Sequence, residues 1–141
     1  MIDEVKARLR EITVFSDLPD DQLTWLAERA QDYHFTPGEV MIQEGSPADA
    51  MIVYLEGESQ GRRESGGRET PTFTARAPQV TGMLPFSRMT TFPLTIRAVT
   101  PVRVLRFPTS MFPEMLQRMP ELGPRLVGVM SDRIREVTRV E

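Results

Sequence analysis

The sequence predicts an α+β fold, an antiparallel eight-stranded β-roll or jelly-roll barrel flanked by N-terminal helices and two C-terminal helices. Three observations predict this fold. Apolar residues recur at helical spacing at both ends of the chain, and Gly and Pro turns punctuate the middle at intervals of roughly 7–12 residues. Short apolar or alternating runs lie between those turns. Runs of strands flanked by runs of helices are typical of the α+β class.

The N-terminal part, residues 1–33, is expected to be helical. Its first helix has an apolar stripe opposite a charged face, formed by Ile2, Val5, Leu9 and Ile12. A second helix follows Ser16 and Asp17, which are capping residue types, and Pro19 suits its first turn, where a missing N–H costs nothing. The predicted buried face of this helix consists of Leu23, Leu26, Ala27 and Ala30.

Residues 34–107 are expected to form the roll. Turns are predicted at Pro37-Gly38, Gly45-Ser46-Pro47, Gly57 and Ser65-Gly66-Gly67. The runs between the turns predict strands at 40–42, 51–55, 70–74, 94–100 and 101–107. The hairpin around 65–67 has polar residues on both sides, so we expect it to project into solvent.

Two C-terminal helices are predicted over residues 108–141. The length of the chain fits one domain, 1–141. The last helix has a heptad seam of apolar residues that predicts a homodimer, formed by Val127, Met130, Ile134 and Val137. The alternative is that this seam packs back on the roll. The helical pattern reaches the last residue without a stop signal, which suggests a piece of a longer protein.

Composition excludes several classes of function. The formal net charge is −3 and the pI is about 5.3, whereas nucleic-acid binding favours a basic surface, so we expect no direct nucleic-acid contact. With no Cys and His34 as the single His, we expect no disulfide framework and no His-rich metal site. No nucleophile–base pair or metal-ligand cluster appears, so we expect no catalytic residue, no cofactor and no enzyme within these residues, and any kinase activity would lie outside them. No apolar run is long enough for a membrane span or a signal peptide, which predicts a cytoplasmic protein.

A set of turns and strands resembles the cyclic nucleotide-binding family. The stretch TPGEVMIQEGSPADAMIVYLEGE contains the family's order of a Pro-Gly turn, an apolar strand, an acidic-Gly turn followed by Asp, a second apolar strand and a Gly. In this chain the positions are Pro37-Gly38, 40–42, Glu44-Gly45 with Asp49, 51–55 and Gly57. The resemblance covers nearly the whole chain and implies the β-roll and a phosphate-binding cassette.

The cassette of the family, as the resemblance implies it, runs Gly-Glu, a short helix and Arg-Ala-Ala-Thr-Val. The equivalent segment here is 82–98, GMLPFSRMTTFPLTIRA, which aligns without a gap up to Thr95. Matching residues are Gly82, Thr95, Ile96 and Ala98. Met83 takes the place of the Glu that binds the ribose and Phe92 that of the Arg that binds the phosphate, while Pro93 and Leu94 replace the two alanines.

These departures predict weak or absent binding of cAMP and cGMP. Losing two charged anchors is expected to weaken binding by about 3–6 kcal/mol. Arg88, in the expected short helix opened by Pro85, offers a displaced positive charge for a small acidic ligand, and Met83 and Phe92 are expected to fill the nucleotide's space. A structural remnant and a surface arginine remain the alternatives. The candidate ligand-binding residues are Gly82, Met83, Leu84, Ser87, Arg88, Phe92, Pro93, Leu94 and Thr95.

The function that these observations favour is a non-catalytic sensing domain that relays a signal through its last helix. The phrases TGMLPFSRMTTFP and RLVGVMSDRIREVTR resemble the N-terminal input domains of bacterial sensor histidine kinases. Two alternatives stay open: a dimerisation or interaction domain without a ligand, and the effector domain of a transcription regulator similar to the catabolite activator proteins.

Overall fold

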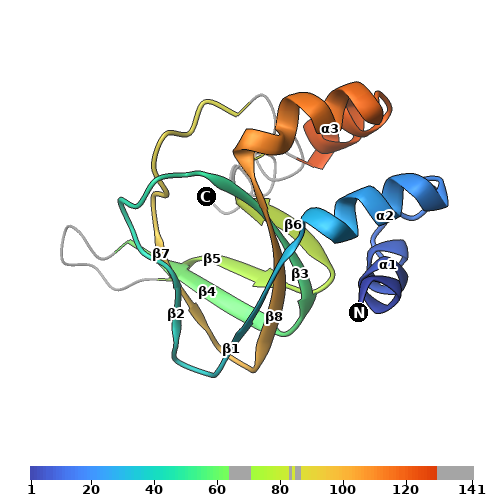
Figure 1. The fold of residues 1–141 in the computed structure, drawn as a ribbon. Coiled ribbons are helices and arrows are strands. Elements are labelled where there is room, and N and C mark those ends of the chain that lie inside the picture. The colour runs from blue at the N-terminus through green and yellow to red at the C-terminus, as the bar shows by residue number, and fades with distance from the viewer. Residues whose placement is uncertain (64–70, 83, 85–86, 130–141) are drawn as a thin grey trace.

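A computed structural model describes residues 1–63, 71–82, 84 and 87–129. Helices lie at both ends of the chain and strands lie between them (Figure 1). The elements are α1 (Ile2–Arg10), α2 (Asp20–Arg29), β1 (Gln31–Phe35), β2 (Val40–Ile42), β3 (Ala50–Glu56), β4 (Glu58–Arg62), β5 (Pro71–Arg76), β6 (Gln79–Gly82), β7 (Thr95–Ala98), β8 (Val102–Pro108), a 3-10 turn (Thr109–Met111) and α3 (Phe112–Arg118). A further helical segment covers 122–129.

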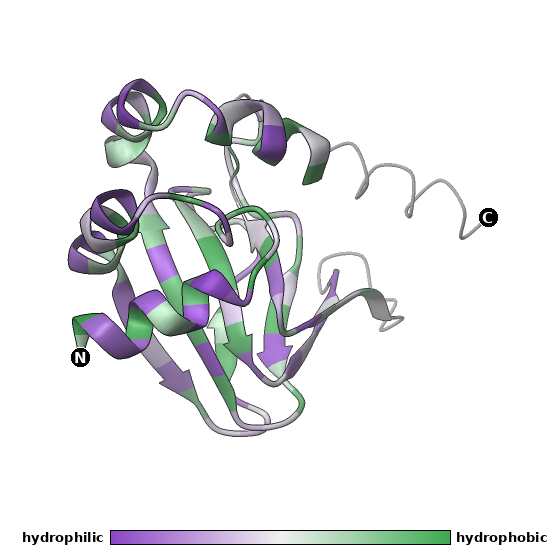
Figure 2. Ribbon diagram, turned by 90° about the vertical axis from the view of Figure 1, so that its right-hand side faces the viewer, coloured by the Kyte–Doolittle hydropathy of each residue, from purple (hydrophilic) through white to green (hydrophobic). Residues whose placement is uncertain are grey.

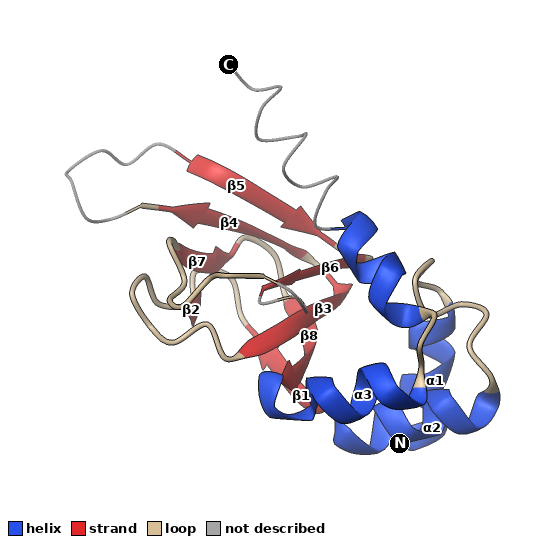
Figure 3. Ribbon diagram, turned by 90° about the horizontal axis from the view of Figure 1, so that it is seen from above, coloured by secondary structure: helices blue, strands red, loops and turns tan. Residues whose placement is uncertain are grey.

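The strands form two four-stranded antiparallel sheets, which confirms the predicted fold class. The order in the first, here named the helix-side sheet, is β1-β8-β3-β6, and the order in the second, the outer sheet, is β2-β7-β4-β5. The helices gather on one side of the helix-side sheet, and the outer sheet lies on the other side (Figure 3).

Two hydrophobic cores follow from this layering. The helix-side core lies between the helices and the helix-side sheet, and the inter-sheet core lies between the two sheets. Strand β3 belongs to both, because successive side chains of a strand point to opposite faces. Val53 faces the helix-side core and Tyr54 the inter-sheet core, and both are fully buried. This double burial explains why β3 is an uninterrupted apolar run.

The N-terminal part differs from the prediction in two places. Strand β1 begins at Gln31, so the helical part ends before residue 33. Pro19, rather than Ser16 or Asp17, occupies the N-cap position of α2, with no side-chain cap. The Ser16 hydroxyl instead donates to the Thr13 carbonyl at 3.0 Å, and Asp17 binds an arginine of the C-terminal segment. Two aspartates in the first turn of α2 still favour its positive end.

Ion pairs hold α1 against the helix-side sheet. Helix α1, which begins at the label N in Figure 2, carries both hydrophobic residues, drawn in green, and hydrophilic residues, drawn in purple. Arg103 on β8 donates to both carboxylate oxygens of Glu4 at 2.7 Å and also to Asp32. The hydrogen bonds from Arg103 hold the pKa of Glu4 below its usual range. Arg8 similarly donates to Glu56 at 2.8 Å and lowers the pKa of that carboxyl.

The helical segment 122–129 packs on the helix-side core. Leu122 and Leu126 are fully buried there. Arg125 donates to Asp17 at 2.5 and 3.0 Å, which joins this segment to the loop between α1 and α2. Val127 is exposed, at 36% of its surface. The other members of the predicted dimer seam, Met130, Ile134 and Val137, lie outside the described residues.

Candidate functional site

The cassette-like segment begins where β6 ends. Gly82 pairs with Met51 of β3 and has a φ of +80°. A Cβ atom at this position would lie 2.8 Å from the carbonyl oxygen of Ala50, so only glycine fits without a backbone shift. The match of Gly82 to the family pattern therefore has a physical cause in the approach of β6 to β3.

The expected short helix is absent from the part of the segment that the structure describes. Leu84 and residues 87–90 have no regular secondary structure, although the Ser87 N–H donates to the Leu84 carbonyl at 3.1 Å. Leu84 is buried in the helix-side core at 1% exposure, and the Ser87 hydroxyl accepts from the Met89 N–H. Met83 and Pro85 lie outside the described residues.

Phe92, which the sequence comparison aligns with the arginine of the family pattern, is buried between the sheets. Its backbone is fixed on both sides, since its N–H donates to the Ser46 carbonyl at 2.9 Å and its carbonyl accepts from the Gly45 N–H at 2.8 Å. Its side chain is 7% exposed and belongs to the inter-sheet core, against which Leu94 also packs. The buried members of that core are Ile42, Ala48, Ile52, Tyr54, Ala75, Phe92, Ile96, Ala98, Val102 and Val104.

The polar groups buried beside this core satisfy one another. The hydroxyls of Tyr54 and Ser59 lie 2.6 Å apart, and both residues are fully buried. Burial raises the pKa of Tyr54. The buried charged residues of the described chain are Lys6 and Arg103, which belong to α1 and to the helix-facing side of β8. Among the described residues, no charged side chain is therefore buried between the sheets to hold a phosphate or a ribose.

The remaining candidate residues are dispersed. Arg88 is exposed, and its guanidinium makes no hydrogen bond or ion pair within the described part of the chain. Pro93 is exposed. Thr95 is buried, and its hydroxyl accepts from the Gln43 amide at 3.1 Å and from the Glu44 N–H at 3.0 Å. The structure thus places the predicted charge of Arg88 on the surface and Phe92 in the interior.

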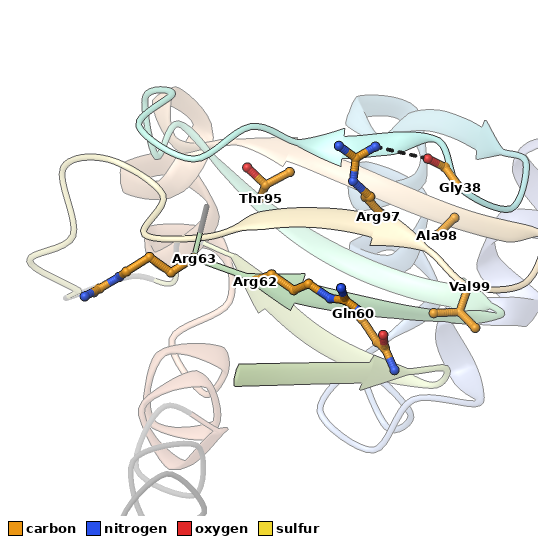
Figure 4. A pocket seen from close by; sticks show the side chains of 8 residues that line it. All are labelled: Gly38, Gln60, Arg62, Arg63, Thr95, Arg97, Ala98 and Val99. Atoms are coloured by element: carbon orange, nitrogen blue, oxygen red, sulfur yellow. Dashed lines mark hydrogen bonds between the residues drawn. The ribbon is translucent and has the colours of Figure 1, made fainter. Parts of the chain in front are cut away.

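A pocket of about 320 Å³ lies elsewhere, on the face of the outer sheet that points away from the inter-sheet core (Figure 4). It shares only Thr95 with the predicted site. Its polar lining consists of Gly38, Gln60, Arg62, Arg63, Thr95 and Arg97. The sequence does not indicate this pocket, because strand β4 has no apolar alternation. The alternation appears only in the fold, where Ser59 and Gly61 are buried while Gln60 and Arg62 are half-buried.

The family assignment agrees with this architecture. The family model described as the cyclic nucleotide-binding domain matches residues 33–119. The chain belongs to the cyclic nucleotide-binding domain family. Domains of this family are ligand-binding and generally regulatory rather than catalytic. Within the described ranges of this chain, no group of three or more His, Cys, Asp or Glu side chains could hold a metal ion. No described helix of this family member is long and apolar enough to cross a membrane.

Solved structures show the same cyclic nucleotide-binding fold. A putative cyclic nucleotide-binding protein from Geobacter metallireducens is 24% identical, with a TM-score of 0.74 over 94% of this chain and 97% of that one. The catabolite activator protein of Thermus thermophilus is 17% identical, with a TM-score of 0.75 over 89% of this chain and 59% of that one.

A third similar structure is a triple mutant of the regulatory subunit of a cAMP-independent protein kinase A from Trypanosoma brucei, bound to cAMP in the A site. It is 21% identical, with a TM-score of 0.75 over 94% of this chain and 46% of that one. At these identities the likeness of all three structures shows the fold alone.

Proposed function

We propose that this chain is a non-catalytic regulatory domain whose roll does not bind a cyclic nucleotide in the pose typical of the family. The observation that carries the proposal is the burial of Phe92 between the sheets, at the position where the family pattern has the phosphate-binding arginine. A benzyl side chain cannot donate the hydrogen bonds that a guanidinium at this position of the family pattern would give to the phosphate.

The energetics support a nucleotide-independent role. A charge-assisted hydrogen bond contributes about 1.5–3 kcal/mol, and an arginine can donate two to one phosphate. Phe92 has no donor, and Met83 replaces the acid that would accept from the ribose. Losing both anchors corresponds to an affinity about a hundredfold to ten-thousandfold weaker. The core around Phe92 would also have to open before a nucleotide could enter.

The Trypanosoma brucei structure offers a parallel. That protein is described as part of a cAMP-independent kinase, and the structure with cAMP contains three substitutions, one of which introduces an arginine. By analogy, we expect that introducing the two missing anchors into this chain, as Met83→Glu with Phe92→Arg, restores binding. This double variant should acquire affinity for cAMP that the unmodified chain lacks.

The output we propose is a relay through the C-terminal helical segment to a downstream partner such as a histidine kinase. Leu122 and Leu126 seat the segment on the helix-side core, and Arg125 joins it to Asp17. A second candidate is a ligand-free dimerisation domain, which the exposure of Val127 favours, because this residue begins the apolar seam. The net charge of −3 supports a role without direct nucleic-acid contact.

Isothermal titration calorimetry with cAMP and cGMP tests the proposal. We expect no binding heat from the unmodified chain at micromolar nucleotide and measurable binding of cAMP by the double variant. Phe92→Leu with Met83→Glu is the matched control, because it supplies the acid without the arginine. Micromolar or tighter binding by the unmodified chain would overturn the proposal. Light scattering tests the second candidate, the ligand-free dimerisation domain, by comparing the molar mass of Val127→Glu with that of the unmodified chain. This candidate requires that the unmodified chain is a dimer and that the variant is a monomer.

A further inference from the structure

The pocket on the outer sheet is built by strand pairing. In the ladder between β4 and β7, Gln60 pairs with Arg97 and Arg62 pairs with Thr95. Residues that pair across strands point to the same face, so all four side chains project from the outer surface of this sheet. Arg62 and Arg97 are diagonal neighbours in this ladder, a separation that long side chains span easily. The backbone pairing of β4 and β7 therefore determines which of these side chains line the pocket.

The charge of the lining has one sign. Three of the described residues that line the pocket are arginines, and none of the described lining residues is acidic. The nearest acid on the same face of β4 is Glu58, whose carboxylate accepts from the guanidinium of Arg76 at 2.7 and 3.1 Å. Arginine charges that line one concavity make its potential positive, and a positive potential attracts an anion. The pocket thus has the electrostatics of an anion site.

The lining offers donors from both paired strands. Arg97 donates to the carbonyl oxygen of Gly38 at 3.4 Å, and its guanidinium is turned toward that residue (Figure 4). Arg62 extends along β4 toward Gln60, whereas Arg63 points away from the other side chains (Figure 4). A guanidinium presents five N–H donors in a planar fork and can hold an anion while making another bond. Gln60 adds an uncharged amide donor.

The size of the pocket and its apolar end narrow the ligand class. A volume of about 320 Å³ lies at the lower end for small-molecule sites, which is enough for one phosphate and a small organic group. Val99 and Ala98 complete the lining, and Val99 is 42% exposed. Exposed apolar surface beside cationic donors matches a ligand with an anionic head and a small apolar portion.

We propose that this pocket binds a small phosphate monoester, with its dianion held by Arg62, Gln60 and Arg97 and its organic group lying against Val99. This inference does not depend on the proposed function, because the outer face of the sheet is separate from the inter-sheet core that contains Phe92. It gives the domain a ligand site that the cassette-like segment does not supply.

Titration of the full chain, labelled with ¹⁵N, with phenyl phosphate at constant ionic strength tests the proposal. We expect saturable shifts of the amide signals of Gln60, Arg62 and Val99, with inorganic phosphate binding more weakly because it lacks the apolar group. Arg62→Gln should weaken phenyl phosphate binding by about tenfold to a hundredfold, because it removes a charged donor. Arg88→Gln is the matched control, since it removes the same charge from another exposed position.

Two results would overturn the inference. One is an Arg88→Gln variant that binds as weakly as Arg62→Gln, which would mean that only the net charge of the surface matters. The other is a titration in which amide signals near Gln60 and Arg62 do not move. Arg97→Gln gives a second measurement, and a dispersed amide spectrum shows that each variant is folded.

A sedimentation arm distinguishes the source of the phosphate monoester. Vesicles of phosphatidylcholine with and without phosphatidic acid are mixed with the unmodified chain and with Arg62→Gln. Sedimentation that requires both phosphatidic acid and Arg62 supports the site and assigns the monoester to a lipid headgroup. Binding of phenyl phosphate without sedimentation supports the site and assigns it to a free ester.

Discussion

Replacing Phe92 with alanine tests whether this side chain fills the space between the sheets. Phe92 is 7% exposed and packed within the inter-sheet core, so the substitution removes its buried contacts and leaves a cavity. Substitutions of this kind lower the free energy of unfolding by about 3–5 kcal/mol. For a chain of 141 residues we expect the Tm to fall by roughly 10–15 °C.

Thermal unfolding with and without benzene is the assay. An apolar cavity of aromatic size stays dry and accepts such a solute, so benzene at ten times its Kd should restore roughly 1.4 kcal/mol to Phe92→Ala. Phe92→Leu is the control, because it keeps most of the volume and leaves no room for benzene. The reasoning fails if Phe92→Ala loses less than about 1 kcal/mol, or if benzene raises the Tm of Phe92→Leu equally.

Two further predictions concern stability. The Arg103 hydrogen bonds depress the pKa of Glu4 below its ordinary 4.5, so the ionised carboxylate stabilises the fold above that value and its contribution is lost as the pH falls through the depressed pKa. Urea unfolding between about pH 5.5 and 3 should therefore show that the free energy of unfolding falls less with decreasing pH in Glu4→Gln than in the unmodified chain. Gly57→Ala should lose more stability than Gly45→Ala, although both have positive φ angles, because only the first would place a Cβ 2.2 Å from the Pro101 carbonyl. Gly45→Ala is expected to cost about 1–2 kcal/mol, and equal losses in thermal unfolding would contradict the role of the close contact.

Much of the fold could be predicted from the sequence where buried side chains are apolar. The prediction of a strand at 40–42 agrees with β2 (Val40–Ile42), and the predicted 51–55 lies within β3. The strand predicted at 101–107 differs by one residue at each end from β8 (Val102–Pro108). In each strand, apolar side chains enter one or both cores and leave a clear pattern in the sequence.

Strand β4 shows why other parts could not be predicted. Its buried residues are Ser59 and Gly61, so its sequence ESQGR has no apolar alternation even though the structural alternation is regular. Strand β1 lacks a pattern for a different reason, since four of its five residues are exposed. Without β4 in place, the β4–β7 ladder that brings Arg62 close to Arg97 could not be foreseen.

The candidate site divides in the same way. The resemblance aligns Phe92 with the arginine of the family pattern, and the structure shows that this side chain is buried between the sheets. That Met83 and Phe92 fill the space of a nucleotide stays a prediction, and Met83 lies outside the described residues. The prediction of Arg88 as an anion ligand depends on a short helix, and the described residues around it are not helical. A sequence indicates which residue types are present, but the direction of a loop arginine depends on backbone geometry that local propensity does not determine.

Strand β3 is a partition only one strand thick between the two cores. Neighbouring residues such as Val53 and Tyr54 face opposite compartments, and both are tightly enclosed. Close-packed interiors have low compressibility and transmit strain. A shift of the β3 backbone caused by repacking between the sheets would therefore also displace side chains that pack against the helices. Double substitutions at these two positions should therefore be non-additive. An event between the sheets can reach the helices across the width of a single strand, without a hinge.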